Sequence, residues 1–237
     1  MATLNELVYS IWLKVTPLIS DDAILDERQL KYFIHNQRSL WIRNEYNKNR
    51  NFDDAVIQSL GAVELEIVDT IENTDITGIS HKILKSKLQI PVAIELHNST
   101  AITRVGSLDL KQKKFSFVDY TAAPYVGNGK FNKNFVFAFL KGGYMYIVSN
   151  CNNPATKALK YINIRGIFAN PEEVGRFTEL DGTKCYSDDD RYPINNWMIP
   201  YIENEIIKGD LKFFMDVKID ESNDANPNNE QLNSDNK

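Results

Sequence analysis

The feature that most constrains the fold is a change in the spacing of apolar residues near residue 60. Before it, apolar residues recur every three or four positions, and Thr3 with Glu6 has the spacing of a capping box, so we expect a first helix over residues 4–15. After it, apolar residues alternate with polar ones, as over residues 63–68, which is the period of a β-strand. A chain that changes period in this way is expected to be α+β, with its helices first.

A second, longer helix is predicted to begin after Asp26, which with Gln29 can cap its first turn. We expect its buried side to carry Leu30, Phe33, Ile34, Leu40 and Trp41. We expect the basic residues to lie mostly elsewhere on the helix, namely Lys31, Arg38, Arg43 and Arg50. His35 follows Ile34, where a histidine at the boundary of the core is more typical than a metal ligand.

The clearest β-hairpin lies in the middle of the chain, where residues 135–140 and 144–149 flank Lys141-Gly142-Gly143. Both segments are apolar on both faces, with Phe137 on one side of the first segment and Ala138 on the other. Such a strand must be covered on both sides, by the same chain or by another subunit. Further strands are expected over residues 90–96, 115–120 and 161–168, and Asn128-Gly129 fits a type I′ turn.

The C-terminal part of the chain is predicted to leave the sheet and return to helix. Asn170-Pro171 begins a turn or a short helix, and an acidic loop follows it. A last helical run is expected to stop at Gly209, and Pro200 within it predicts either a kink or, as we favour, a new helix with Pro200 in its first turn. Residues 220–237 are polar, with Leu232 as their only large apolar residue, so they cannot form a core of their own.

These patterns together predict two N-terminal helices, a central antiparallel β-sandwich or barrel, a C-terminal helix and an extended polar tail. We place the boundaries so that the chain has a helical segment, a β-rich domain, an acidic loop with the C-terminal helix, and a polar tail. These are residues 1–60, 61–170, 171–219 and 220–237.

Charge is distributed unevenly along the chain. The net charge is −5, but residues 111–170 carry a net +8 and residues 171–237 a net −9. The total excludes a generally basic protein that coats nucleic acid. Two complementary blocks indicate complementary surfaces, which meet either within one fold or between neighbouring copies, and the sequence leaves both readings open.

Residue types that carry catalysis or bind metals are scarce. His35, His81 and His97 are the only histidines, Cys151 and Cys185 the only cysteines, and none falls in a hydrolase, zinc or thiol-redox motif. Gly127-Asn128-Gly129-Lys130 lacks the spacing of a phosphate loop, and three adjacent aspartates cannot easily converge on one calcium ion. We therefore expect no enzyme, cofactor or metal. A hydrolase that uses Cys151, with His97 as its base, or the acidic loop stays an alternative.

Membrane insertion and secretion are not expected either. The chain has no run of about 18 apolar residues. Its first residues lack the basic and then apolar order of a signal peptide, so we expect a soluble protein that is not secreted by that route.

A second alternative is a module that binds single-stranded nucleic acid. Aromatic residues and lysines are mixed over residues 111–146, as on a surface where bases stack and phosphates are neutralised. The opposing interpretation is that the aromatics form core or subunit interface and the lysines are solvated loop residues. We favour that interpretation, because many of the aromatics alternate within apolar strands.

Two stretches resemble a known family. The first is the opening helix with Pro17-Leu18-Ile19-Ser20-Asp21-Asp22 and the following helix around Arg28, Ile34, Arg38 and Arg43. The second runs from Tyr192-Pro193-Ile194 through Trp197-Met198-Ile199-Pro200-Tyr201-Ile202 to Ile206-Ile207-Lys208-Gly209-Asp210-Leu211-Lys212-Phe213. Both are similar to neck or connector ring proteins of tailed bacteriophages, particularly crAss-like phages, and together they cover about a third of the chain.

The resemblance implies a virion structural protein, assembled in the host cytoplasm, that forms a closed ring of twelve copies below the portal. Its implied partners are other copies, the portal protein and other neck or tail rings, with genomic DNA passing through the channel without sequence-specific contact. Since neighbours in a cyclic ring meet through two different faces, the charge blocks become candidate interfaces. The candidate residues are Lys111, Lys113, Lys114, Lys130, Lys133, Phe137, Asp188, Asp189, Asp190 and Leu232.

Overall fold

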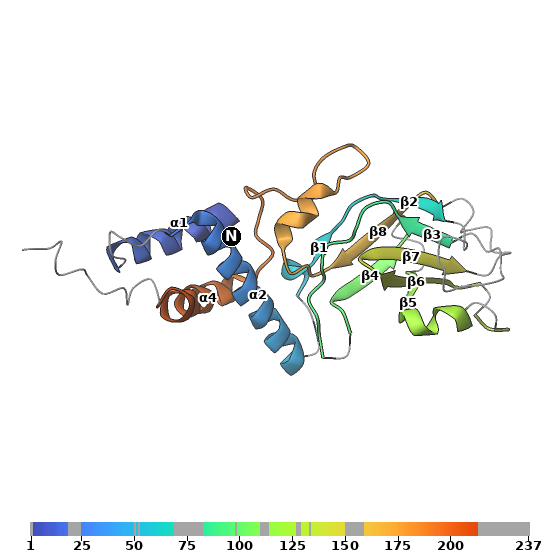
Figure 1. The fold of residues 1–237 in the computed structure, drawn as a ribbon, viewed down its shortest axis with the longest axis horizontal. Helices are drawn as coiled ribbons and strands as arrows, with labels where there is room; N and C mark the ends of the chain where they lie inside the picture. Colours follow the sequence, from blue (N-terminus) through green and yellow to red (C-terminus); the bar gives the residue numbers. More distant parts are fainter. Residues whose placement is uncertain are drawn as a thin grey trace, which may run out of the picture.

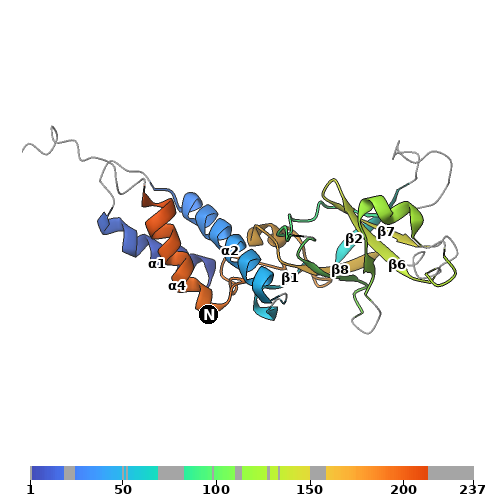
Figure 2. The same cartoon turned by 90° about the horizontal axis from the view of Figure 1, so that it is seen from below.

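The molecule is elongated, with three helices packed together at one end and a curled β-sheet at the other (Figures 1 and 2). The computed structural model describes residues 2–18, 25–49, 51, 53–68, 83–97, 99–109, 114–126, 129–132, 134–149 and 159–212. The α+β class, the order of its parts and the C-terminal helix agree with the sequence prediction. The predicted tail, residues 220–237, lies outside the described residues.

Helix α1 spans Leu4–Val15, as predicted. The Thr3 hydroxyl accepts a hydrogen bond from the Glu6 amide at 3.2 Å, and the Glu6 carboxylate accepts one from the Thr3 amide at 3.0 Å. The capping box therefore satisfies two amides that a helix start leaves without partners.

Helix α2 spans Glu27–Asn49 and contains two departures from the predicted faces. Leu30 and Ile34 are buried as expected, but Leu40 is 52% exposed, so its assignment to the buried side is wrong. Arg38 was expected mostly outside the core, yet it is 0% exposed. The reason is that the helix faces main-chain carbonyls at this position, and an arginine can bind them whereas an apolar residue cannot.

Helix α4, Ile199–Glu205, has Pro200 in its first turn, as predicted. It continues without interruption into a π-helical turn, Ile206–Asp210, so the expected stop at Gly209 is wrong. Leu211, just after this turn, is completely buried, and the wider π turn brings it onto the core. Glu203 of α4 accepts a hydrogen bond from Ser10 at 2.8 Å and pairs with Lys14 at 2.5 Å, which ties α4 to α1.

The sheet contains eight strands in the described part of the chain. They are β1 Gln58–Ser59, β2 Val63–Val68, β3 Ile83–Ser86, β4 Ile102–Gly106, β5 Ser116–Phe117, β6 Val136–Lys141, β7 Tyr144–Ser149 and β8 Tyr161–Gly166. Their order is β1-β8-β2-β3-β7-β6-β5, and β4 also pairs with β8. Every pair is antiparallel except β5 with β6, which run parallel because the 3₁₀ helix Tyr120–Tyr125 crosses between them.

The hairpin β6–β7 is covered on both faces, as its composition predicts. Ala138 and Met145 are completely buried in the main core. Phe139 and Tyr146 point to the other face, where their rings stack at 5.2 Å and a smaller cluster, which includes Tyr120, covers them. Both faces are therefore buried within this one chain.

Two predicted strands are shorter or absent in the structure. Residues 90–96 form isolated bridges at Ala93 and Glu95 and no continuous strand. Residues 115–120 contribute only the two residues of β5. In β2 the alternation also breaks, because Ile67 is 61% exposed while Val68 is buried. The predicted turn at Asn128 lies outside the described residues.

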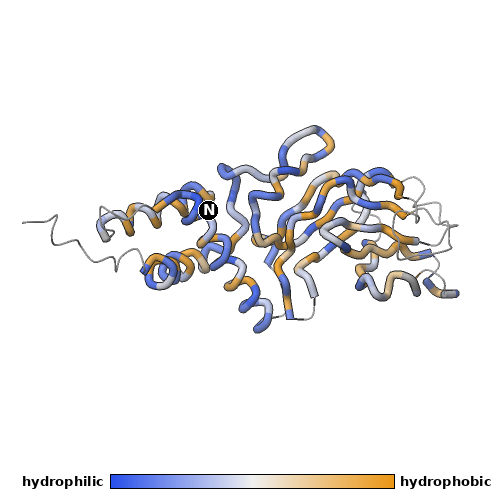
Figure 3. The backbone as a smooth tube through the Cα atoms, in the orientation of Figure 1, coloured by the Kyte–Doolittle hydropathy of each residue, from blue (hydrophilic) through white to orange (hydrophobic). Residues whose placement is uncertain are grey.

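One hydrophobic core runs from the helical end into the sheet. A single cluster of buried residues includes Ile11 of α1, Ile34 of α2, Ile164 of β8 and Ile147 of β7. Apolar and polar segments alternate along the three helices, as amphipathic packing requires (Figure 3). The two ends of the molecule are thus continuous in packing, and the polar junction described next fixes how they meet.

Candidate assembly surfaces

Arg38 lies at the centre of the junction between the helical end and the sheet. Its Nε donates to the carbonyl of Pro193 at 2.7 Å, and its Nη1 donates to the carbonyl of Phe168 at 2.8 Å. The guanidinium also lies 5.6 Å from the centre of the Tyr192 ring. Burial lowers the pKa of Arg38, yet arginine stays protonated in proteins, so one buried cation joins α2 to two irregular segments.

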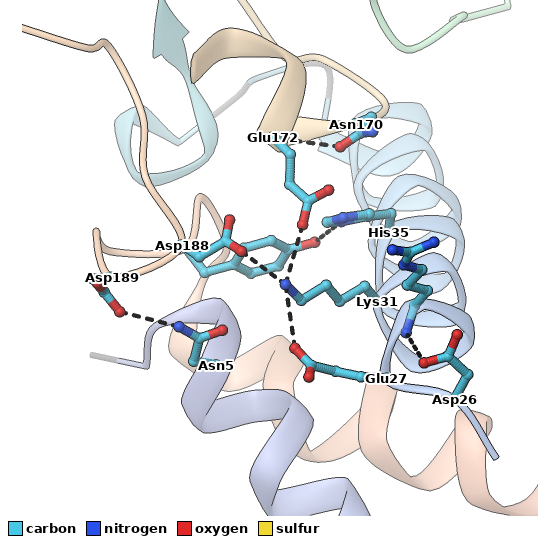
Figure 4. A network of polar contacts seen from close by, with 11 residues as sticks. Asn5, Asp26, Glu27, Lys31, His35, Asn170, Glu172, Asp188 and Asp189 are labelled. Carbon is cyan, nitrogen blue, oxygen red and sulfur yellow. Dashed lines mark hydrogen bonds and ion pairs between the residues drawn. The ribbon is translucent and has the colours of Figure 1, made fainter. Parts of the chain in front are cut away.

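A second contact of the junction is centred on Lys31, about two turns before Arg38 on α2 (Figure 4). Its Nζ lies 2.8 Å from Asp188, 3.4 Å from Glu27 and 3.6 Å from Glu172. Burial alone lowers the pKa of Lys31, but the hydrogen bond and charge of Asp188, with the other two carboxylates, outweigh it and raise the pKa. The lysine is therefore charged and holds the acidic loop against α2.

Between these two residues, His35 Nδ1 and the Tyr192 hydroxyl lie 2.8 Å apart, and both side chains are buried. Burial, with the nearby charge of Arg38, lowers the pKa of His35 to about 4. Burial also raises the pKa of Tyr192. Both are neutral near pH 7, so this pair is a structural hydrogen bond and not an acid–base couple.

The three predicted acidic residues all have contacts within the chain. Asp188 binds Lys31, and Asp189 accepts a hydrogen bond from the Asn5 side chain at 3.1 Å. Asp190 accepts one from the Ser187 amide at 2.7 Å, which closes the loop on itself. Asp189 and Asp190 remain exposed and can face a neighbour; Asp188 is partly covered by α2.

The predicted basic and apolar candidates separate into three groups. Lys114 and Lys130 are exposed. Phe137 is buried within the hairpin. Lys111, Lys113, Lys133 and Leu232 lie outside the described residues.

The aromatic residues of the basic region fall into a buried set and an exposed set. Phe139 and Tyr146 belong to the core, but Tyr125 is 82% and Phe131 is 86% exposed. Lys130 Nζ lies 5.8 Å from the centre of the Phe131 ring. We call Phe117, Tyr125, Lys130 and Phe131 the β5–β6 edge, because they lie on β5 or on the connection from β5 to β6.

The two charge blocks are not joined by ion pairs between the residues that the structure describes. Those pairs link helical residues with one another or with residues 172–203, or link β2 with β3 and the residue that follows β3. Lys141 of the basic block donates a hydrogen bond to the Tyr120 hydroxyl at 2.8 Å, and its Nζ lies 4.3 Å from the centre of that ring. The structure therefore leaves the exposed basic edge available to a partner.

The most prominent surface feature is one that the sequence prediction missed. Residues 178–184 form a short hairpin, here called the arm, which projects from the top of the molecule in Figure 1. All seven residues are exposed, and Leu180 at the tip is 69% exposed. The sequence contains a common hairpin signal there, the dipeptide Asp181-Gly182, but the prediction of an acidic loop does not include a hairpin.

The arm is ordered by its own hydrogen bonds and is anchored at its base. The Glu179 amide donates to Thr183 O at 2.9 Å, and Gly182 adopts a φ of 84° that favours glycine. The base is fixed to the chain before β2, where the Ala62 amide donates to Thr178 O at 3.1 Å. Gly61 is required there, because a Cβ would lie 2.6 Å from Cys185 Sγ.

Two grooves flank the arm. One has a volume of about 470 Å³ and is lined by Lys87, Leu88 and Tyr161 opposite the arm. The other has a volume of about 490 Å³ and is lined by Leu108 and Arg165. Both are open clefts, so a neighbouring surface can reach the arm from either side.

Of the cysteines and the candidate base, the structure describes Cys185 and His97. Cys185 is half-buried, and burial together with Glu179 and Asp181 raises the pKa of its thiol to about 11, which opposes nucleophilic chemistry. His97 is exposed, and Cys151 is outside the described residues. Among the residues that are described, no group of three or more His, Cys, Asp or Glu side chains is placed to hold a metal ion. Of the helices in the same part of the chain, none combines the length and apolar character needed to cross a bilayer.

A rigid body with exposed, chemically different surfaces is typical of an assembly subunit. Comparison with known proteins identifies the family: residues 6–236 match the family model described as phage tail ring protein 2. The chain belongs to this family. It is also 26% identical over 210 residues to ring protein 2 of Bacteroides phage crAss001, an alignment that covers 87% of this chain and 89% of that protein. The predicted resemblance to ring proteins of crAss-like phages is confirmed, and the protein is a structural ring component of a phage virion.

Proposed function

We propose that the protein forms a closed ring of about twelve copies in the neck of the virion, where it joins capsid and tail around the DNA channel. The observation that carries this proposal is the family match over residues 6–236, which includes both the helical end and the sheet. Its partners are other copies, the portal protein and adjacent neck or tail rings, and it assembles in the host cytoplasm. DNA passes through the channel without sequence-specific contact, and the protein catalyses no reaction.

The two ends of the molecule have different roles in this proposal. The helical end carries a cluster of three aromatic rings, in which Trp41 lies 6.4 Å from Trp197 and 5.3 Å from Tyr201. Trp197 is 46% and Tyr201 is 54% exposed. Exposed aromatic clusters of this kind are typical of protein contacts, so we assign the helical end to the adjacent ring.

The segment boundaries of the sequence prediction are part of the same proposal. Residues 1–60 and 171–219 build the helical end and the junction and also contribute β1 and the arm. Residues 61–170 build the rest of the sheet, which contacts neighbouring copies, and residues 220–237 reach an adjacent subunit or ring. The continuous core and the Arg38 junction hold the two ends in one orientation, which a ring of defined diameter requires.

The test is direct observation of the assembly. Native mass spectrometry and negative-stain imaging of the purified full chain should show closed rings with one copy number. Antibody labelling of virions should place the protein between capsid and tail. A chain that stays monomeric at all concentrations, both alone and mixed with portal protein, would contradict the ring. Labelling at the distal tail would contradict the neck position.

A further inference from the structure

We infer that the arm, residues 178–184, is the contact that links neighbouring subunits, and that it binds the β5–β6 edge of a second copy of this chain. This inference rests on the proposed ring. It names the two surfaces that meet in that ring.

The first argument is that the arm is already in a binding conformation. Its turn is closed by the hydrogen bond from Gly182 N to Glu179 O at 3.0 Å and by the Asp181 carboxylate, which accepts from the Thr183 amide at 2.9 Å. The residues that flank it, Phe177 and Tyr186, are 3% and 5% exposed. Because the arm is ordered before binding, little conformational entropy is lost when it docks.

The second argument is the chemistry of the tip. Leu180 is 69% exposed between two acidic residues, Glu179 and Asp181, and both of these are exposed as well. A rigid hairpin that presents one leucine to water gains stability when that side chain enters an apolar site on a partner. The two carboxylates select a partner surface that is apolar and basic.

The third argument is that the β5–β6 edge has this composition. Tyr125 and Phe131 are the most exposed large hydrophobic residues in the described part of the chain, and Lys130 lies beside Phe131. Residues 111–170, which include this edge, contain nine basic residues and one acidic residue. In the proposed contact the leucine of the arm packs against the aromatic rings of the edge, which buries apolar surface. The carboxylates of the arm face the lysine of the edge, so the charges are complementary.

The fourth argument is position. The arm is anchored beside β2, whereas the β5–β6 edge is the end of the sheet beyond β3 and β7. In Figure 1 the arm projects from the top of the molecule, whereas β5 lies at the bottom. They cannot meet within one chain, but opposite faces are what a head-to-tail contact in a ring requires.

The test is disulfide trapping in a Cys151→Ser, Cys185→Ser background. Chains carrying only Leu180→Cys are mixed with chains carrying only Phe131→Cys under mild oxidation, and we expect a cross-linked dimer that grows no further. A chain carrying both substitutions should give a ladder that ends at the copy number of the ring. The matched control pairs Leu180→Cys with Leu13→Cys on α1, which is 56% exposed, and should give at least tenfold less dimer.

Charge reversal provides an independent measurement. Glu179→Lys and Lys130→Glu should each raise the concentration needed for half-maximal ring formation about tenfold, and the combined variant should recover most of the loss. Asp181 is not used, because it orders the arm through Thr183. Leu180→Asp should weaken assembly at least as strongly while the melting temperature stays unchanged, since Leu180 is exposed.

The outcomes separate this inference from the ring itself. If the wild-type chain forms rings but neither the ladder nor the charge rescue is seen, the arm contact is wrong and the ring stands. If Lys130→Glu abolishes binding to single-stranded oligonucleotides and leaves ring formation intact, the edge is a nucleic-acid surface and the inference is also wrong. If the wild-type chain forms no rings, the failure lies in the proposed function.

Discussion

The junction and the β6–β7 hairpin are both buried, but they are held together by different forces. The hairpin depends on apolar side chains packed on two faces, and its stability follows the area removed from water. The junction depends on a few hydrogen bonds from α2 to segments more than 100 residues away, through Lys31, His35 and Arg38. The hairpin should therefore respond to changes in volume or polarity, and the junction to changes in single polar atoms and in pH.

The largest effect is expected in the hairpin. Phe137→Asp places a carboxylate without a partner where the phenylalanine ring is 7% exposed. We expect the loss in the free energy of unfolding to be comparable to the whole stability of a typical domain, about 5–15 kcal/mol. Soluble expression should be abolished, as measured by the soluble fraction in lysates. Phe137→Leu is the control and should lower the free energy of unfolding by only a few kcal/mol. Wild-type solubility of Phe137→Asp would show that this side chain is not buried.

At the junction, Arg38→Met removes the charge but leaves the carbonyls of Phe168 and Pro193 without their donor. We expect a loss of about 2–4 kcal/mol in the free energy of unfolding, measured by denaturant titration. Arg43→Met is the matched control on the exposed side of α2 and should change stability by less than about 0.5 kcal/mol. If both substitutions lowered the free energy of unfolding equally, the hydrogen bonds of Arg38 would not be what stabilises the junction.

The pH dependence of stability should distinguish the two regions further. Because the pKa of His35 falls from 6.5 to about 4 on folding, the unfolded state binds more protons between these values, and stability falls as the pH is lowered through that window. Between pH 7 and pH 5 the loss should be about 2 kcal/mol. His35→Gln should remove most of this slope. If the variant kept the same slope of stability against pH, titratable groups other than His35 would be its cause.

A smaller effect on stability, but a clear one on assembly, is expected for the aromatic cluster at the helical end. Trp197→Ala should cost the isolated chain no more than about 1 kcal/mol, since the side chain is 46% exposed. Incorporation into the neck should nevertheless decrease, as measured by co-purification with portal and adjacent ring proteins. Tyr32→Ala, which removes an exposed aromatic elsewhere on α2, is the control and should incorporate normally.

The smallest effect on the isolated chain is expected from deleting residues 220–237. Their composition supports no core, so the melting temperature should stay nearly unchanged. Incorporation into the neck should weaken, and more so at high salt, if the acidic residues pair with lysines of another subunit. Normal incorporation of the truncated chain, or a marked drop in its melting temperature, would contradict a role between subunits.

Local elements of the fold were predictable because their signals are short-range. The capping box of Thr3 and Glu6, Pro200 in the first turn of α4, and the apolar hairpin all depend on residues a few positions apart. The candidate site was predicted less completely. Lys130 is exposed as a surface residue should be, but the arm was missed, since Leu180 between two acidic residues resembles any solvated loop until its anchors are known.

The sequence by itself determined the class of the fold, the order of helices and strands, and the family, because periodicity and motifs are properties of neighbouring residues. Only the tertiary structure decided that Arg38 is buried, that Leu40 is exposed and that the arm and the β5–β6 edge lie on opposite sides. The partners of Arg38 are main-chain carbonyls 130 and 155 residues away, in segments without regular structure. Every residue type carries such a carbonyl, so no pattern in the sequence can mark the two that Arg38 binds.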